Sequence, residues 1–256
     1  MNLFNQFIKS LYSPKDIAKF RFQGIGKTIL YVFFLSFLSL IPSAYYFSAA
    51  IVNGLEVTKN TFENEVPTFV IKDGQLSLDS KTPVTIEKDD FNIILDSTGS
   101  LQADDIGDSE NAIALLKNEF VFAAGGQVQT YNYALFSDMK LANKDIVSFI
   151  HSMDNLKMIF LPILILVMYI FSSGLKFIGI SIYAAVGIFL AKLLQKNVPY
   201  RQLWRMAAYS VTIPTIFFAI MVALQTTVPN GFLINWLVSI MVLMLALKEI
   251  PVKKQK

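Results

Sequence analysis

The chain has 256 residues, of which 54% are hydrophobic and only 16% are charged, and its formal net charge at pH 7 is +3. Because soluble domains carry roughly 25% charged residues, this composition excludes an ordinary soluble protein, and the small net charge gives no reason to expect a nucleic-acid partner. The lack of cysteine excludes disulfides and thiolate metal sites, and a single histidine argues against a histidine-built one. We therefore expect no metal and no cofactor.

Residues 1–27 predict two short basic helices. One apolar helical face would consist of Leu3, Phe4, Phe7, Ile8 and Leu11. A second helix should begin with Ser13 as its N-cap, Pro14 at the first helical position and Asp16 placed to bond back. Five basic residues and one acid favour a cytoplasmic position at the membrane interface. The alternative is a helical hairpin that packs on the protein's own cytoplasmic loops.

Residues 28–53 predict the first transmembrane helix. Thr28–Val52 is an apolar run of about 25 residues, too long for the core of a signal peptide, and Pro42 should kink it. Basic residues precede the run and an acidic region follows it. Since basic residues mark the cytoplasmic side, we expect a cytoplasmic N-terminus and an extracytoplasmic segment 54–155.

Segment 54–155 predicts an α+β domain with an antiparallel sheet. Its sixteen acids against seven lysines between residues 54 and 151 make it acidic. Expected strands are Thr68–Lys72, Gln75–Leu78, Pro83–Glu87, Phe91–Leu95, Phe120–Ala124 and Val128–Ala134. Asp73-Gly74 and Gly125-Gly126 are hairpin signals. Ser109–Lys117 has helical spacing, and Lys140–His151 is expected to lead as a helix into the next span.

The region 156–250 predicts the remaining transmembrane helices, followed by a basic tail, 251–256. Its candidate spans are Met158–Gly174, Phe177–Leu194, Arg205–Val228 with Pro214 inside it, and Gly231–Ile250. With Thr28–Val52 they give about five hydrophobic helices. The expected fold is a membrane all-α bundle with an inserted extracytoplasmic α+β domain.

The side of the tail depends on how many helices cross the bilayer. Five crossings from a cytoplasmic N-terminus place the basic tail outside, against the positive-inside rule, whereas four place it inside. Neither count is expected to put both the tail and the basic segment Lys192–Arg205 on the cytoplasmic side. The side of the C-terminus therefore stays open at this stage.

The sequence contains no recognisable catalytic constellation. No charged residue is expected deep within a span, because Lys176 falls between two of them, and this argues against an ion-coupled carrier. The acids Asp104, Asp105, Asp108 and Glu110 could ligate calcium, but they lack the spacing of a calcium loop, so a solvated turn is favoured. The Asp96-Ser97-Thr98-Gly99 segment fits a polar turn after a strand, and His151 near Asp154 fits a lone interfacial histidine. We expect a protein that is not an enzyme.

The most distinctive segment is Tyr200–Pro214. Arg201 and Arg205 are one helical turn apart and directly precede a span that contains Tyr209 and Pro214. Arginines on lipid headgroups, Trp204 at the boundary and a proline-kinked helix would form an interfacial anchor. These five residues, Arg201, Trp204, Arg205, Tyr209 and Pro214, are the candidates for contact with lipid or a partner.

This segment resembles the signature of the broad Yip-type group of multi-span membrane proteins. Together with Ser13–Arg21, Gly26-Lys27-Thr28, the Asp73-Gly74 hairpin and Phe91–Gly99, it makes the chain similar to a Gram-positive bacterial family of maltodextrin utilisation membrane proteins, of undefined biochemistry. The resemblance covers most of the chain. It implies a multi-pass protein of the bacterial plasma membrane that works beside a sugar importer.

The resulting functional expectation is a non-enzymatic accessory protein. It would assist or regulate maltodextrin uptake through contacts of its extracytoplasmic domain with a ligand, a maltodextrin importer or another membrane protein. The aromatic residues Phe91, Phe120, Phe122, Tyr131 and Tyr133 could stack on a glucan, although aromatic residues that alternate in strands more often belong to a core. The alternative function is an envelope sensor or scaffold that signals across the membrane.

Overall fold

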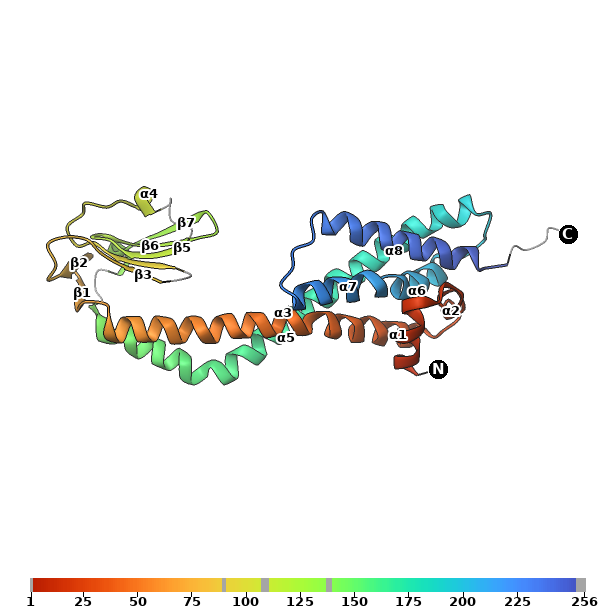
Figure 1. Cartoon of the computed structure of the whole chain (residues 1–256), viewed down its shortest axis with the longest axis horizontal. Coiled ribbons are helices and arrows are strands. Elements are labelled where there is room, and N and C mark those ends of the chain that lie inside the picture. The colour runs from red at the N-terminus through yellow and green to blue at the C-terminus, as the bar shows by residue number, and fades with distance from the viewer. Residues whose placement is uncertain (1, 89–90, 107–110, 137–139, 252–256) are drawn as a thin grey trace. The chain divides into compact units, whose positions relative to one another are not determined.

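The computed structural model describes residues 2–88, 91–106, 111–136 and 140–251 (Figure 1). The chain divides into two compact units. We call Met1–Ala49 together with Ile159–Lys256 the helical unit, and Ala50–Met158 the sheet domain.

Two short helices, α1 (Leu3–Tyr12) and α2 (Pro14–Phe20), open the helical unit, as predicted. The Ser13 hydroxyl accepts a hydrogen bond from the backbone N–H of Asp16 at 3.3 Å and donates to the Asp16 carboxylate at 2.9 Å. Pro14 occupies the first helical position. This capping arrangement fixes the corner between the two helices.

Four helical segments are long and apolar enough to cross a membrane. They are α3 (Ile25–Asn64), α5 (Asn143–Leu193), α6 (Tyr200–Ser210) with α7 (Thr212–Ala223) as one segment, and α8 (Gly231–Lys248). This count of four covers the described residues only. Helices of the length and hydropathy that a membrane span needs, which the composition predicted, are therefore present.

The expected number of about five hydrophobic helices is not confirmed. Two of the expected spans, on either side of Leu175 and Lys176, belong to the single 51-residue helix α5. Leucine and lysine are both good helix formers, so a charge between two apolar runs does not end a helix in the way that a turn would. Lys176 accordingly lies inside α5.

The break between α6 and α7 has a local cause in Pro214. Proline has no N–H to donate to the carbonyl four residues earlier, and its ring clashes with that carbonyl, which here belongs to Ser210. Ser210 is the last residue of α6, and Val211 separates the two helices. A kink was predicted at Pro214, and the structure instead has a break between two helices.

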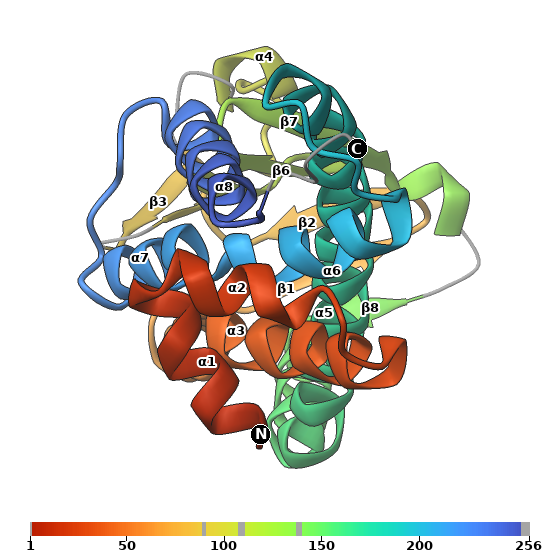
Figure 2. The same cartoon turned by 90° about the vertical axis from the view of Figure 1, so that its right-hand side faces the viewer.

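The N-terminal helices pack on the other helices of this unit. α2 contacts α6 and α8, while α1 contacts α6 and α7, and Figure 2 views the chain from the side on which α1 and α2 lie in front. Ile17 and Phe20 of α2 join a buried cluster with Tyr31, Leu203 and Leu247. The apolar side of α2 is therefore covered by protein.

The sheet domain contains two sheets. The smaller sheet has the order β2-β1-β8 and the larger sheet the order β3-β4-β5-β6-β7. The strands are β1 (Phe69–Lys72), β2 (Gln75–Leu78), β3 (Val84–Glu87), β4 (Asn92–Leu95), β5 (Asn111–Leu115), β6 (Glu119–Ala124), β7 (Gln127–Asn132) and β8 (Leu141–Ala142). Helix α4 (Ala103–Ile106) and the 3₁₀ turn η1 (Tyr133–Phe136) complete the domain. All strand pairs are antiparallel except β4 with β5.

Both predicted hairpins are confirmed. Asp73 and Gly74 join β1 to β2 with φ values of 52° and 74°, and Gly125 and Gly126 join β6 to β7 with φ values of 56° and 75°. Positive φ at both central residues is the geometry that suits the twist of a two-residue hairpin. The expected strands around these turns are present with small changes at their ends.

The helix predicted at Ser109–Lys117 is wrong, because its described part contains strand β5; Ser109 lies outside the described residues. Ala112 and Ala114 are buried in one apolar cluster of the domain, and Leu115 in another. A strand that is buried on both faces reads as a continuous apolar run, and such a run can imitate helical spacing.

Candidate functional site

The candidate residues of Tyr200–Pro214 divide between the surface and the interior. Arg201 is exposed, whereas Tyr209 and Pro214 are buried. The Trp204 ring is partly buried, lies parallel to the Phe177 ring with centroids 6.2 Å apart, and donates a hydrogen bond from Nε1 to Ser181 Oγ at 3.1 Å. Trp204 therefore ties α6 to α5.

Arg205 does not lie free at the protein surface as an interfacial anchor would. Its side chain is buried, and its guanidinium donates to the backbone carbonyl of Arg21 at 2.8 Å. Arg21 ends α2, where helix carbonyls lack intrahelical partners and carry the negative end of the helix dipole. Arg205 thus caps α2, while its contact with lipid headgroups stays a prediction.

Tyr209 is the centre of a polar cluster within the apolar core. Its hydroxyl lies 2.9 Å from Oε1 of Gln6 on α1 and 3.2 Å from Oε1 of Gln23, which follows α2. The hydroxyl has a single proton, so the two acceptors share it. The Tyr209 side chain therefore connects α6 with both ends of the N-terminal segment.

Tyr31 of α3 extends this cluster. Its ring lies 4.3 Å from that of Tyr209, and its hydroxyl is 2.5 Å from Thr212 Oγ1. Thr212 donates to the backbone carbonyl of Tyr209 at 2.7 Å, so Tyr31 is the donor in the shorter contact. We call Gln6, Gln23, Tyr31, Tyr209 and Thr212 the tyrosine cluster.

The N-terminal helices were expected either to lie at the membrane interface or to pack on the protein as a hairpin. One face of α1 fits each of these alternatives. On α1 the polar residues Gln6 and Ser10 are buried against the protein, while Phe4, Ile8 and Tyr12 are exposed. Leu3 and Phe7 of the same helix also pack against the buried cluster, so the side of α1 that faces the protein is mixed. The hairpin packs on the membrane helices, and it also presents an apolar stripe of the kind that an interfacial helix inserts among headgroups.

The sheet domain contains a cavity of about 890 Å³. Nine of its thirteen lining residues are purely aliphatic or phenyl side chains, which come from α3, β1, β5, β6, β8 and α5. The other four are Thr58, Tyr131, Tyr133 and Asp145. The Asp145 carboxylate accepts a hydrogen bond from the backbone N–H of Ala142 at 2.8 Å, so it serves the start of α5. The cavity is therefore largely apolar.

Tyr133 is the most deeply buried polar residue of this cavity. Its hydroxyl has no hydrogen-bond partner among the described residues. Burial and the nearby Glu119 carboxylate both raise its pKa, so the hydroxyl stays protonated and available as a donor. Of the aromatic residues proposed to stack on a glucan, Phe120, Tyr131 and Tyr133 line the cavity, whereas Phe91 packs against a core cluster.

The polar turn after β4 has a structural role. Asp96 is buried and accepts hydrogen bonds from the backbone N–H groups of Thr98 and Leu101, both at 2.8 Å, and from the hydroxyls of Thr98 and Ser100. Burial alone would raise the pKa of Asp96, but these hydrogen bonds lower it below the usual value. A saturated carboxylate of this kind closes a turn.

The remaining acidic groupings show no metal site within the part of the chain that the structure describes. Asp104 and Asp105 lie in α4, whereas Asp108 and Glu110 fall outside the described residues. Within the described ranges no three histidine or acidic side chains are close enough to hold a metal ion. A lone histidine was expected at His151, but its Nε2 lies 2.6 Å from Oε1 of Glu63. Lys157 is the residue that contacts Asp154.

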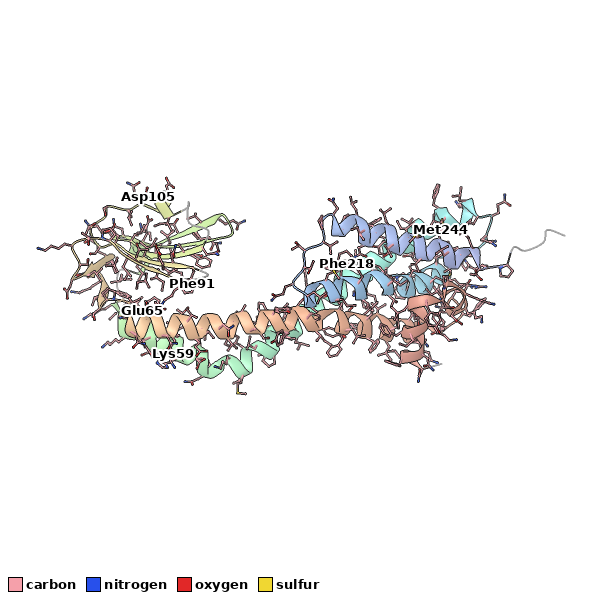
Figure 3. The ribbon with its side chains drawn as sticks, viewed as in Figure 1. Lys59, Glu65, Phe91, Asp105, Phe218 and Met244 are labelled. Carbon is pink, nitrogen blue, oxygen red and sulfur yellow. The ribbon has the colours of Figure 1, made fainter. Side chains whose placement is uncertain are left out.

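The expectation that no charge lies deep within a span is wrong at Lys176 of α5. Its Nζ donates to Ser39 Oγ at 3.0 Å, and Ser39 is near the middle of the apolar run Thr28–Val52. A cavity of about 400 Å³ borders both residues. Phe218, labelled in Figure 3, is on its wall together with Asn235 and Trp236.

Most of these pairings were not visible in the sequence. The polar residues Gln6 and Ser10 on the face of α1 opposite to its apolar stripe were a signal that this face seeks a polar partner. Nothing in the sequence paired Gln6 with Tyr209, which is 203 residues away.

The chain matches one known protein family over most of its length. Residues 4–247 match the family described as Protein of unknown function (DUF1189), so the chain belongs to that family. No curated protein and no solved structure matches it.

The tyrosine cluster should contribute measurably to the stability of the helical unit. We expect Tyr209→Phe to lower the free energy of unfolding by about 1–3 kcal/mol, because the hydroxyl that bonds the buried Gln6 and the partly buried Gln23 is removed. Tyr200→Phe is the matched control, since the Tyr200 hydroxyl is exposed and its contact with the Ser181 carbonyl is 3.4 Å long. Thermal unfolding in detergent measures both, and equal midpoints for the two variants would contradict the assigned role.

Proposed function

We propose that this DUF1189 protein is a non-enzymatic accessory protein of the bacterial plasma membrane, whose sheet domain binds an apolar ligand and which supports maltodextrin uptake through contact with an importer. The observation that carries the binding role is the apolar cavity of about 890 Å³ in the sheet domain. Ligand pockets typically have volumes of 300–1,000 Å³ and apolar walls with a few polar groups. This cavity fits that description.

The walls favour a hydrocarbon-like ligand over a glucan. Every hydroxyl of a buried sugar needs a hydrogen-bond partner, and a group left without one costs roughly 1–3 kcal/mol. The lining offers only four polar side chains, and one of them, Asp145, already binds a backbone N–H. We therefore assign the link with maltodextrin to a protein partner, on the basis of the family resemblance, and assign the cavity to an apolar molecule.

The proposed topology places the N-terminus in the cytoplasm and residues 54–155 outside. With four crossings, α5 returns to the cytoplasm, so the segment Lys192–Arg205 lies inside, and α8 then returns the basic tail to the same side. Both basic clusters obey the positive-inside rule in this arrangement. The expectation that no count places both clusters inside is wrong for four crossings, because α3 and α5 together return the chain to the side of its N-terminus.

The alternative function, a sensor or scaffold that signals across the membrane, is favoured by one observation. Helices α3 and α5 both run without interruption between residues of the sheet domain and residues of the helical unit. In the helical unit, α3 also contributes Tyr31 to the tyrosine cluster that holds the N-terminal helices. Occupancy of the sheet domain would then be relayed through α3 and α5.

The cavity should react with a photoactivatable fatty acid in native membranes. We expect labelled peptides from the sheet domain, and Ile113→Trp should reduce their labelling several-fold because the indole fills the cavity. Val128→Trp is the matched control, since Val128 is an exposed strand residue that does not line the cavity. Undiminished labelling of Ile113→Trp, or loss of labelling on addition of maltodextrin, would contradict an apolar ligand.

The topology can be tested with single cysteines, because the chain has none of its own. In intact cells, a membrane-impermeant maleimide should label Lys81→Cys, whereas Asn197→Cys and Lys254→Cys should react only after the cells are opened. Labelling of Asn197→Cys in intact cells would refute the four-crossing arrangement.

The role in uptake calls for a genetic test. Deletion of the gene should slow growth on maltodextrin and leave growth on glucose unchanged, and crosslinking in native membranes should recover importer subunits. Unchanged maltodextrin uptake would remove this part of the proposal. Recovery of regulatory proteases or kinases in place of importer subunits would support the sensor instead.

A further inference from the structure

The cavity beside Lys176 contains a cation that the helical unit does not neutralise. In the sequence of that unit, residues 1–49 and 159–256, the only acids are Asp16 and Glu249. Asp16 already contacts Lys9 and Lys19, and Glu249 is exposed at the end of α8. Neither is paired with Lys176 among the described residues.

A charge in this position is costly without a partner. A lysine at the centre of a membrane helix costs about 2.5–3.5 kcal/mol on insertion scales, and such residues usually face a protein interior and pair with another group. Lys176 does face the interior, but its one hydrogen bond goes to the neutral hydroxyl of Ser39. A neutral hydroxyl does not balance a full positive charge.

The other cavity residues suit an anionic group with an apolar remainder. Ser172, Thr215 and Asn235 bring hydroxyl and amide groups to the wall that Lys176 shares, and these groups can donate hydrogen bonds to an oxyanion. Ser39 is on the same wall, but its hydroxyl donates to the Ser36 carbonyl and accepts from Lys176, so it positions the lysine. Aromatic and aliphatic side chains form the rest of the wall, among them Phe218, Phe232 and Trp236. The volume of about 400 Å³ admits a headgroup and the first part of a chain.

The place of the cavity along the helices also fits an amphiphile. Phe232, Asn235 and Trp236 belong to the first two turns of α8, and Phe218 and Val222 belong to the second half of α7. Residues 224–230 between these helices form the loop at that end of the bundle.

From these observations we propose that Lys176, held by Ser39, forms with Ser172, Thr215 and Asn235 an anion site inside the helical unit that takes the phosphate of an amphiphile, such as a phospholipid headgroup. The shared chemistry is one oxyanion held by one ammonium group and neutral donors. This site is separate from the sheet-domain cavity and does not rest on the function proposed above. Either proposal can fail without the other.

The test uses the full chain in lipid nanodiscs. Phosphatidylcholine discs with and without phosphatidylglycerol are compared by thermal unfolding, and lipid that remains bound after mild detergent extraction is measured by native mass spectrometry. We expect phosphatidylglycerol to stabilise the wild type, and Lys176→Met to reduce the retained phosphatidylglycerol about ten-fold through loss of a charge-assisted contact.

The control variants separate the site from general electrostatics. Lys192→Met makes the same change at an exposed position of the same helix and should retain the lipid as the wild type does. Lys176→Arg keeps the charge and should keep most of the response. Because loss of an unpaired buried charge is often tolerated, Lys176→Met should fold, and Lys176→Gln replaces it if it does not.

A second arm identifies the source of the anion. Inorganic phosphate added to pure phosphatidylcholine discs should leave the wild-type midpoint unchanged if the lipid is the ligand. Stabilisation by free phosphate in the wild type, lost in Lys176→Met, would support the anion site with a soluble ligand and overturn the lipid assignment. If neither probe distinguishes wild type from the neutral variants, the proposal is refuted.

Discussion

The helical unit is organised by one constraint: a polar group that enters a lipid environment must find its partner within the protein. Where water is excluded, each unmatched donor or acceptor costs several kcal/mol. The tyrosine cluster satisfies this constraint for five residues from four segments of the chain. Arg205 satisfies it for the end of α2. Apolar side chains gain little free energy by moving from lipid to a protein surface. Hydrogen bonds, more than apolar contact, therefore determine where the N-terminal helices lie.

The sheet domain follows the opposite rule. Its polar side chains mostly serve local turns, as Asp96 does after β4 and Asp145 does at the start of α5. Its apolar side chains divide into two buried clusters on the two faces of the larger sheet, and they leave a cavity that they do not fill. The cavity is partly open to the surface, since Phe149 and Tyr131 on its wall are exposed, and its size and apolar walls are those of a typical ligand pocket.

Local chemistry explains what could be predicted from the sequence. Ser13-Pro14, Asp73-Gly74 and Gly125-Gly126 each specify a conformation through their own backbone preferences, and the structure has a cap or a turn at each. The helix prediction for Ser109–Lys117 was wrong because burial on both faces removes the alternation of polar and apolar residues that distinguishes a strand. The prediction of two spans within α5 was wrong because a charged residue lowers the local hydropathy but does not end the helix.

The candidate site was harder to predict than the fold. Arg205, Trp204 and Tyr209 were chosen as residues for a membrane boundary, where basic and aromatic side chains are common. Their partners lie in α2, α5 and α1, and contacts over such sequence separations leave no pattern in a single sequence. Hydropathy places Lys176 between two spans and gives no indication of its partner Ser39 or of the cavity beside it.

The length of α5 between Tyr169 and Lys176 has a consequence for how this chain can vary. These residues are seven positions apart, which is close to two helical turns, and both reach α3, Tyr169 at the Phe33 carbonyl and Lys176 at Ser39. Insertion of one residue between them would rotate the lysine by about 100° around the helix axis, away from its hydroxyl partner. Insertions and deletions should therefore be excluded from this stretch, while loops such as 224–230 can change length freely.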